Sequence, residues 1–175
     1  NAYNTVLIED AAESLGSEYK DKKSGSFGHL SILSFNGNKI ITTSGGGALM
    51  SDDEKLILHA KKLSTQSREK VIHYEHKEIG YNYRLSNILA GIGRAQLLVL
   101  DERVKRKREI FDKYIEELSD IDNIQFLTEG KNIISNRWLT TLKFKSNQKL
   151  VYSIINALEK ENIESRPLWK PMHMQ

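Results

Sequence analysis

Short apolar runs separated by polar turns dominate the first fifty residues of the chain. Residues 6–8 form such a run, and two acids, Glu9 and Asp10, follow it. A continuous apolar run predicts a strand that is buried on both faces of a parallel sheet. Residues 30–35 and 47–51 predict two further strands. Ligands bind outside the carboxyl ends of strands in such sheets, so Asp10 lies where a ligand is expected.

Helical spacing of apolar residues replaces the strand pattern after the third predicted strand. Asp52 or Asp53 can cap a helix that runs to about Leu63. Residues 64–84 are polar and irregular, which predicts an extended excursion. Residues 85–118 then predict one long helix or two abutting helices. Two glycines inside this stretch, Gly91 and Gly93, allow a kink or close helix packing.

The pattern of apolar and polar residues changes again beyond residue 120. Residues 124–126 and 139–144 predict strands, residues 150–161 a helix, and residues 163–164 the start of another strand. This βαβ-like tail predicts a second, smaller domain. The chain is therefore predicted to be an α/β protein in which helices sandwich a mostly parallel sheet and a long helix leads to part of a small α+β domain.

Composition narrows the functional classes. The 175 residues contain no cysteine, which excludes a disulfide framework and a thiolate metal site and fits a reducing cytoplasm. No apolar run approaches the roughly 20 residues that cross a bilayer, which gives no indication of a membrane partner. The net charge of +3 permits anionic ligands without requiring nucleic acid. The basic run 105–108 is interpreted as a solvated helix face with (i, i+4) pairing.

Lys39 is the main candidate for a catalytic residue, because acidic and hydroxyl side chains lie near it in the predicted sheet. It lies in a polar turn after the second predicted strand, and Asp10 ends the first one. A neutral lysine amine can form a Schiff base with an aldehyde. A carboxylate opposite a pyridine nitrogen keeps that nitrogen protonated, so that the ring withdraws electrons. Neighbouring hydroxyls and backbone N–H groups can hold a phosphate.

Several segments of the chain resemble the DegT-type sugar aminotransferases, which are fold type I enzymes that use pyridoxal 5'-phosphate (PLP). The segments are residues 8–16 (IEDAAESLG), 25–28 (GSFG), 34–47 (SFNGNKIITTSGGG), 80–87 (GYNYRLSN) and 166–173 (RPLWKPMH). They span nearly the whole chain in order. Within the family, residues 34–47 and 166–173 resemble the branch of bacillosamine-type 4-aminotransferases, which act on UDP-linked 4-keto-6-deoxy sugars.

The resemblance implies a role for each matching residue. Lys39 would carry PLP and move protons as base and acid. Asp10 would pair with the pyridinium nitrogen, and Glu13 would lie near the ring hydroxyl. Ser34 would contact the cofactor phosphate. Asn82 would reach the phosphate of a neighbouring subunit's cofactor, which implies a homodimer with shared sites.

The resemblance also implies the substrates and the domain limits. Lys170 and His173 would lie on the nucleotide-sugar side. Glutamate would donate the amino group, and C4 of a UDP-4-keto sugar would receive it, in surface glycan biosynthesis. The large PLP-binding domain would occupy residues 1–95, a connecting helix 96–119 and part of the small domain 120–175.

The sequence leaves alternative functions open, and it differs from the family in length. A PLP-dependent sugar dehydratase of the same fold carries histidine at the lysine position, and Lys39 argues against it. A second alternative is a non-catalytic regulatory or interaction protein on the same fold. A third is a basic helical binding module. Family members are about twice this long, so we expect the chain to be a fragment that lacks the phosphate-binding loop, the ring-stacking aromatic residue and some strands, and that binds PLP weakly or not at all.

Overall fold

The computed structural model describes residues 3–145 and 148–175, and the chain forms two compact units. The first unit comprises Asn1–Asp112 and Glu129–Thr140, and the second comprises Lys113–Thr128 and Thr141–Gln175. Residues 129–140 belong to the first unit although they follow part of the second, so each unit consists of two separate segments of the chain. The domain limits of the full-length protein stay a prediction.

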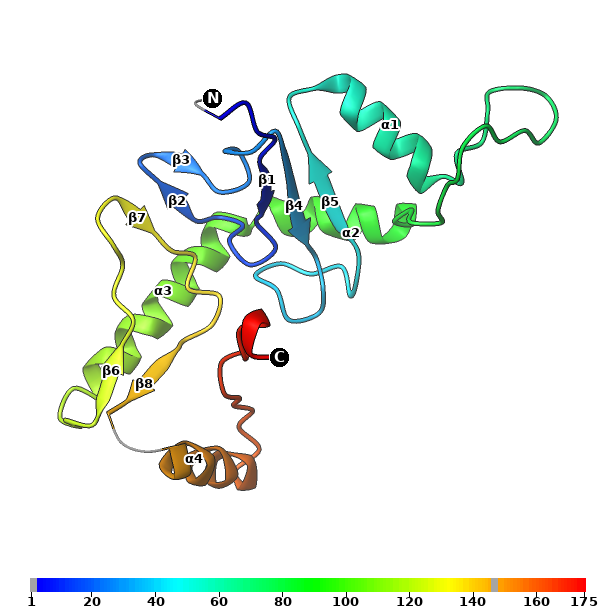
Figure 1. Cartoon of the computed structure of the whole chain (residues 1–175). Helices are drawn as coiled ribbons and strands as arrows, with labels where there is room; N and C mark the ends of the chain where they lie inside the picture. The colour runs from blue at the N-terminus through cyan, green and yellow to red at the C-terminus, as the bar shows by residue number, and fades with distance from the viewer. Residues whose placement is uncertain (1–2, 146–147) are drawn as a thin grey trace. The chain divides into compact units, whose positions relative to one another are not determined.

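The elements are labelled in Figure 1. In chain order they are β1 (Ile8–Asp10), β2 (Glu18–Tyr19), β3 (Lys22–Lys23), β4 (Leu30–Ser34), β5 (Gly47–Met50), α1 (Glu54–Ser64), α2 (Asn87–Leu97), α3 (Leu100–Glu117), β6 (Ile124–Phe126), β7 (Ile133–Ile134), β8 (Leu142–Phe144), α4 (Gln148–Lys160) and η1 (Met172–Met174). No helix in residues 3–145 and 148–175 is long and apolar enough to cross a membrane.

Three strands, β1, β4 and β5, lie side by side in one sheet (Figure 1). β1 runs parallel to β4, with Asp10 opposite Ile32, whereas β5 runs antiparallel to β4, with Gly47 opposite Ser34. The described part of the sheet is therefore mixed, and the expectation of a mostly parallel sheet does not hold there. The reason is the connection from β4 to β5, which contains no helix that could cross over to a parallel strand.

The two faces of this sheet differ in exposure. Successive side chains of a strand point to opposite faces, so Leu33 is buried while Ile32 is 39% exposed. On the same open face Ile8 is 63% exposed and Leu49 is 41% exposed. The prediction of a first strand buried on both faces was wrong, because no described element covers this face. The strand also begins at Ile8 rather than at residue 6.

The buried face of the sheet forms the core that positions the following loop. The core cluster consists of Ala11, Leu33, Phe35 and Ile41, with Leu15, Ile40, Ala48, Met50 and Leu100 packed against it. Phe35 N donates to Gly46 O (3.0 Å) and Thr43 N donates to Phe35 O (3.0 Å). Both bonds join residues of the loop 35–46 to each other, so they close the loop where it leaves the sheet.

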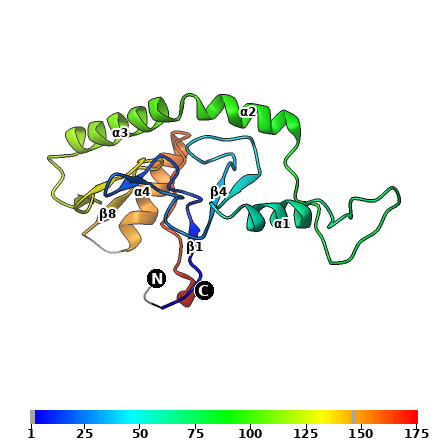
Figure 2. The same cartoon turned by 90° about the horizontal axis from the view of Figure 1, so that it is seen from above.

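Two helices of the first unit, α1 and α2, begin at side-chain caps, and the sequence predicts the cap of α1 at Asp52 or Asp53. Asp53 caps α1 by accepting from Lys55 N (2.8 Å), and Leu89 N donates to the hydroxyl of Ser86 (3.3 Å) at the start of α2. The predicted helical stretch 85–118 is confirmed as two helices, α2 and α3, and Figure 2 shows the break between them. Gly93 is buried and its backbone lies close to Thr43.

The second unit contains the antiparallel pair β6–β8 and the helix α4. The strand at 124–126 and the helix near 150–161 are confirmed, whereas β8 begins at Leu142 rather than at residue 139. The strand predicted at 163–164 was wrong. Asn162 adopts a positive φ of 59°, and Ile163 N bonds back to Leu158 O (2.9 Å), which caps α4 instead.

Candidate active site

The turn that carries Lys39 is fixed by its two flanks. Phe35 on one side and Ile41 on the other are both buried in the core cluster. Within the turn, Lys39 N donates to Asn36 O (3.1 Å). Because both anchors are buried, the backbone at Lys39 has little freedom to move.

The amine of Lys39 points into the protein. Its side chain is only 12% exposed, and Nζ lies 3.0 Å from Glu13 Oε1. Nζ also lies 4.7 Å from the centroid of the Trp138 ring. Removing an ammonium group from water is costly unless it is paired, and a carboxylate together with an aromatic face supplies that pairing. This placement differs from that of an ordinary surface lysine.

Asp10 and Ser34 lie on the open face of the sheet, at the carboxyl ends of two parallel strands. Asp10 is the last residue of β1 and pairs with Ile32, and Ser34 is two residues further along β4. Strand alternation therefore places both side chains on one face. Asp10 Oδ1 accepts from Ala12 N (3.1 Å), and Ser34 Oγ accepts from Asn36 N (3.4 Å). The structure brings these two residues together beside the turn of Lys39.

Glu9 faces the other side of β1 and organises the segment Gly25–Gly28. Its carboxylate accepts from Gly25 N (2.7 Å), Phe27 N (2.9 Å) and the hydroxyl of Ser24 (3.3 Å). Burial alone raises the pKa of Glu9, but these hydrogen bonds outweigh it and hold the pKa below its ordinary value. A Cβ at Gly28 would lie 2.6 Å from Leu30 O, so only glycine fits there.

Asn136 links the surroundings of Lys39 to a distant part of the chain. Its side chain is buried, and Nδ2 donates to Glu13 O (3.0 Å) and to Leu15 O (2.9 Å). Its Oδ1 accepts from Trp138 N (3.2 Å), and its backbone N–H donates to Ser17 Oγ (2.9 Å). Sequence reasoning missed Asn136 and the contact of Trp138 with Lys39, because no local pattern signals a contact between residues so far apart.

An ion pair anchors the same loop to α3. Arg108 donates to Glu129 Oε2 (3.1 Å) and to Ser135 O (2.7 Å). The hydrogen bond from Arg108 holds the pKa of Glu129 below its ordinary value. The interpretation of the basic run 105–108 as a solvated face was wrong for Arg108, since its partner is distant in sequence. Arg106 pairs with Glu109 at i+3 rather than i+4.

Asn82 lies in the excursion between α1 and α2. Its backbone bridges Thr65 at the end of α1. Lys62 fastens the same excursion to α1 through Glu69 (2.7 Å) and Glu78 (2.9 Å). The contacts described for Asn82 are therefore within the excursion, and none of them joins Asn82 to Lys39.

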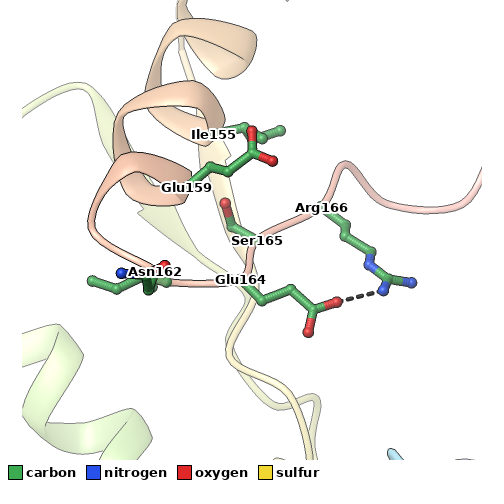
Figure 3. A pocket seen from close by; sticks show the side chains of 7 residues that line it. Ile155, Glu159, Asn162, Glu164, Ser165 and Arg166 are labelled. Carbon is green, nitrogen blue, oxygen red and sulfur yellow. Dashed lines mark ion pairs between the residues drawn. The ribbon is translucent and has the colours of Figure 1, made fainter.

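Lys170 and His173 belong to the second unit, where both are exposed. Upstream of them, residues 155–166 line a hollow of about 430 Å³. Figure 3 shows the hydroxyl of Ser165 pointing toward α4, while Arg166 points away and pairs with Glu164. The Ser165 hydroxyl is buried and has no hydrogen-bond partner within the described ranges.

Comparisons with known proteins match this chain over its whole length. The model of the DegT/DnrJ/EryC1/StrS aminotransferase family covers residues 1–175. EpsN of Bacillus subtilis (strain 168), provisionally named a pyridoxal phosphate-dependent aminotransferase, is 58% identical over 175 residues, which are 100% of this chain and 45% of EpsN. The chain thus spans a little under half the length of EpsN.

Two further relatives and one solved structure carry more specific names. GDP-perosamine synthase of Escherichia coli O157:H7 is 38% identical over 97% of this chain and 46% of its own length. The UDP-4-amino-4,6-dideoxy-N-acetyl-beta-L-altrosamine transaminase of Campylobacter jejuni (strain 81-176) is 37% identical over 84% of this chain and 36% of its own length. The PLP-form of Spr1654 from Streptococcus pneumoniae, provisionally named a sugar aminotransferase, matches with a TM-score of 0.87 at 27% identity, over 95% of this chain and 44% of Spr1654.

Proposed function

Because this chain belongs to the DegT/DnrJ/EryC1/StrS aminotransferase family, we propose that it is the lysine-bearing part of a PLP-dependent sugar aminotransferase. The enzyme moves an amino group from glutamate to C4 of a UDP-linked 4-keto-6-deoxy sugar. It works in the cytoplasm, which the absence of cysteine fits, and serves surface glycan biosynthesis. The observation that carries the proposal is the placement of Lys39, a mostly buried amine beside a carboxylate and an aromatic ring.

The residues around Lys39 fit the chemistry of PLP. Asp10 offers an exposed carboxylate at the end of β1 for the pyridinium nitrogen, and Ser34 offers a hydroxyl at the end of β4 for the phosphate. Both lie on one face of the sheet, next to the turn that presents Lys39. When bound, PLP supplies an electron-withdrawing ring that makes the proton on the neighbouring substrate carbon removable.

The protein then has to move that proton. Lys39 Nζ takes it from one carbon and returns it to another, so the same amine acts as base and as acid. Glu13 Oε1, at 3.0 Å, stabilises the ammonium form between the two transfers. Glu13 thus acts on the amine in this mechanism, whereas the resemblance implied a place near the ring hydroxyl.

The names of two relatives support a nucleotide-linked sugar as the amino acceptor. The Campylobacter relative is named as a transaminase of a UDP-linked 4-amino sugar, which favours transfer at C4 with a UDP carrier. The Escherichia relative is named for a GDP-linked product, so the nucleotide has to be tested directly. Lys170 and His173 are proposed to contact this substrate.

We propose a homodimer in which Asn82 reaches the phosphate of the neighbouring subunit's cofactor. In support, Asn82 is exposed in an excursion that Lys62 fastens to α1. The 175-residue chain alone is proposed to bind PLP weakly, since the chain is less than half as long as the relatives named above.

The experiment is an assay of the full-length protein with PLP, glutamate and a panel of UDP-, GDP- and dTDP-4-keto sugars, read by mass spectrometry. We expect the mass of an amino sugar from a UDP-linked substrate, and a visible PLP absorbance band that Lys39→Ala removes. Lys55→Ala, an exposed lysine of α1, is the matched control and keeps both signals.

Each alternative gives a different result in this assay. A dehydratase would consume the sugar without incorporating nitrogen. A non-catalytic protein would leave every sugar unchanged and show no absorbance that depends on Lys39. Either result would overturn the proposal, and amination of GDP-linked sugars alone would overturn its UDP part.

A further inference from the structure

Asn136 occupies an unusual position for a polar residue outside the expected site. We infer that Asn136 is a positioning residue that keeps the Lys39 amine shielded from solvent by fixing Glu13 and Trp138 at the same time. This inference rests on the proposed function only for its catalytic meaning, since the geometry concerns the side chains of this chain alone. Neither the sequence motifs nor the family resemblance pointed to this residue.

The side-chain amide of Asn136 uses both of its donor hydrogens and its oxygen in hydrogen bonds. It is 2% exposed, and both amide hydrogens are used, one on Glu13 O and one on Leu15 O. An asparagine amide has only two donors, so none remains for water or another partner. Its Oδ1 accepts from Trp138 N. One buried amide therefore joins the turn 13–15 to the loop that carries Trp138.

Both segments joined by this amide contact Lys39. Glu13 places Oε1 3.0 Å from Nζ, and the ring of Trp138 lies 4.7 Å from Nζ. The carboxylate attracts the ammonium by charge, and the aromatic face attracts it through the ring quadrupole. Loss of the amide frees the backbone on both sides, so both contacts with Lys39 loosen together.

The direction of the effect follows from what these contacts stabilise. Both contacts surround the amine and shield it from solvent. When they loosen, the amine is accessible to solvent and to reagents more often. A cation–π contact contributes roughly 0.5–1 kcal/mol, which corresponds to about a three-fold change in the fraction of molecules with an accessible amine. We therefore expect Asn136 variants to make Lys39 more reactive toward an acylating reagent.

Substitution of Asn136 by aspartate is the sharpest single change, because the shape of the side chain stays the same. Asn136→Asp replaces the two donors by a carboxylate oxygen that faces Glu13 O and Leu15 O, and acceptors repel one another. Asn136→Ser is a milder variant, which keeps one hydroxyl donor in case the aspartate variant does not fold. Ser86→Ala, which removes the side-chain cap of α2 and leaves α1 with Lys55 unchanged, is the control for stability loss alone.

The experiment measures Lys39 directly, without turnover. The PLP-free full-length protein is treated with limiting acetic anhydride at one fixed pH, and the acetylation of Lys39 is quantified by mass spectrometry. Exposed Lys55 in the same sample serves as the internal reference. We expect the Lys39/Lys55 rate ratio to rise about three-fold in both Asn136 variants and to stay unchanged in Ser86→Ala.

A double-mutant cycle tests whether the effect passes through the proposed contacts. Glu13→Gln and Trp138→Phe should each raise the ratio in the wild-type background. Each should add less to the ratio in the Asn136→Ser background, since that contact is already loosened. In a Trp169→Phe background, Trp138 is the single tryptophan of this chain, and its emission should shift to the red in Asn136→Ser.

Two results would overturn the inference. If the Asn136 variants lower the melting temperature but leave the Lys39/Lys55 ratio at the wild-type value, Asn136 is a structural brace only. If Glu13→Gln changes the ratio by the same factor with and without Asn136, the two act independently. Because no PLP or sugar is present, a failure of the proposed enzymatic function would not affect either reading.

Discussion

At the scale of single residues, the carboxylate of Glu9 is held by two backbone N–H donors and one hydroxyl. The hydrogen bonds from Gly25, Phe27 and Ser24 outweigh burial and keep the pKa of Glu9 below its ordinary value of 4.5. A carboxyl whose pKa is lower in the folded state stabilises the fold above its unfolded pKa, and this contribution disappears as the pH falls through the folded pKa.

Glu9→Gln should therefore destabilise the protein in a pH-dependent manner. We expect the free energy of unfolding to fall by about 1 kcal/mol near neutral pH, because an amide accepts weaker hydrogen bonds than a carboxylate. The difference from wild type should shrink below about pH 4. Urea unfolding at both pH values measures it, with exposed Glu161→Gln as the control, and a difference that persists unchanged in acid would contradict the prediction.

Ser165 presents the opposite case, a buried hydroxyl oxygen that lacks a partner within residues 3–145 and 148–175. Ser165→Ala removes that oxygen, so we expect the free energy of unfolding to rise by about 1 kcal/mol. Ser153→Ala in α4 is the matched control, since its hydroxyl donates to Lys149 O (3.0 Å). Equal shifts of the urea midpoint in the two variants would show that the Ser165 hydroxyl is satisfied.

At the scale of elements, α2 contains two glycines in different surroundings. A Cβ at Gly91 would meet nothing within 4 Å, whereas one at Gly93 would lie 3.1 Å from Thr43 Cγ2. Alanine in a helix interior is favoured over glycine by about 1 kcal/mol. Gly91→Ala should therefore raise the melting temperature, and Gly93→Ala should raise it less or lower it, because the buried Thr43 must shift.

Thermal unfolding of the two glycine variants provides the measurement. The helicity gained by alanine is the same in both, so the difference between them reports the contact with Thr43. Equal increases for Gly91→Ala and Gly93→Ala would mean that α2 does not pack closely against Thr43.

The elements that could be predicted from the sequence are those with local signals. Asp53 before a helical apolar pattern predicted α1, and the apolar runs predicted β4 and β5 within one residue of their ends. The two-residue strands β2, β3 and β7 were missed, because they are too short to show a period. Their existence depends on pairing between Glu18 and Ile134, which no local rule encodes.

The same distinction applies to the candidate site. Asp10 and Ser34 end strands and Lys39 follows one, and strand ends are visible in a sequence. Trp138 reaches Lys39 only through tertiary packing of a loop almost a hundred residues later. Whether each predicted residue performs its role stays a prediction that the experiments above address.

At the scale of the whole chain, one face of the β1–β4–β5 sheet is open. Ile8, Ile32 and Leu49 are exposed on it, and contiguous apolar surface of this kind is uncommon on soluble domains. The 175-residue chain alone should bind the dye ANS. The double variant Ile32→Thr with Leu49→Thr should reduce ANS fluorescence at unchanged far-ultraviolet circular dichroism, because threonine keeps the strand propensity without the apolar surface.

ANS titration in parallel on the full-length protein completes this test. We expect less dye fluorescence per molecule there than from the 175-residue chain. Undiminished fluorescence in the threonine double variant would place the apolar surface elsewhere, for instance on the exposed Leu58 of α1.

The contact between Asn136 and Glu13 also has a consequence for the order in which the protein is made. The two residues are 123 positions apart, and the pairing of β2 with β7 likewise forms only after Ile133 and Ile134 have been synthesised. During synthesis a ribosome releases Lys39 well before the loop that shields it. Contacts of such long sequence separation form slowly. A nascent chain therefore carries Lys39 without these contacts while residues 40–138 are added, and a truncation between Lys39 and Asn136 keeps the lysine but lacks the loop that shields it.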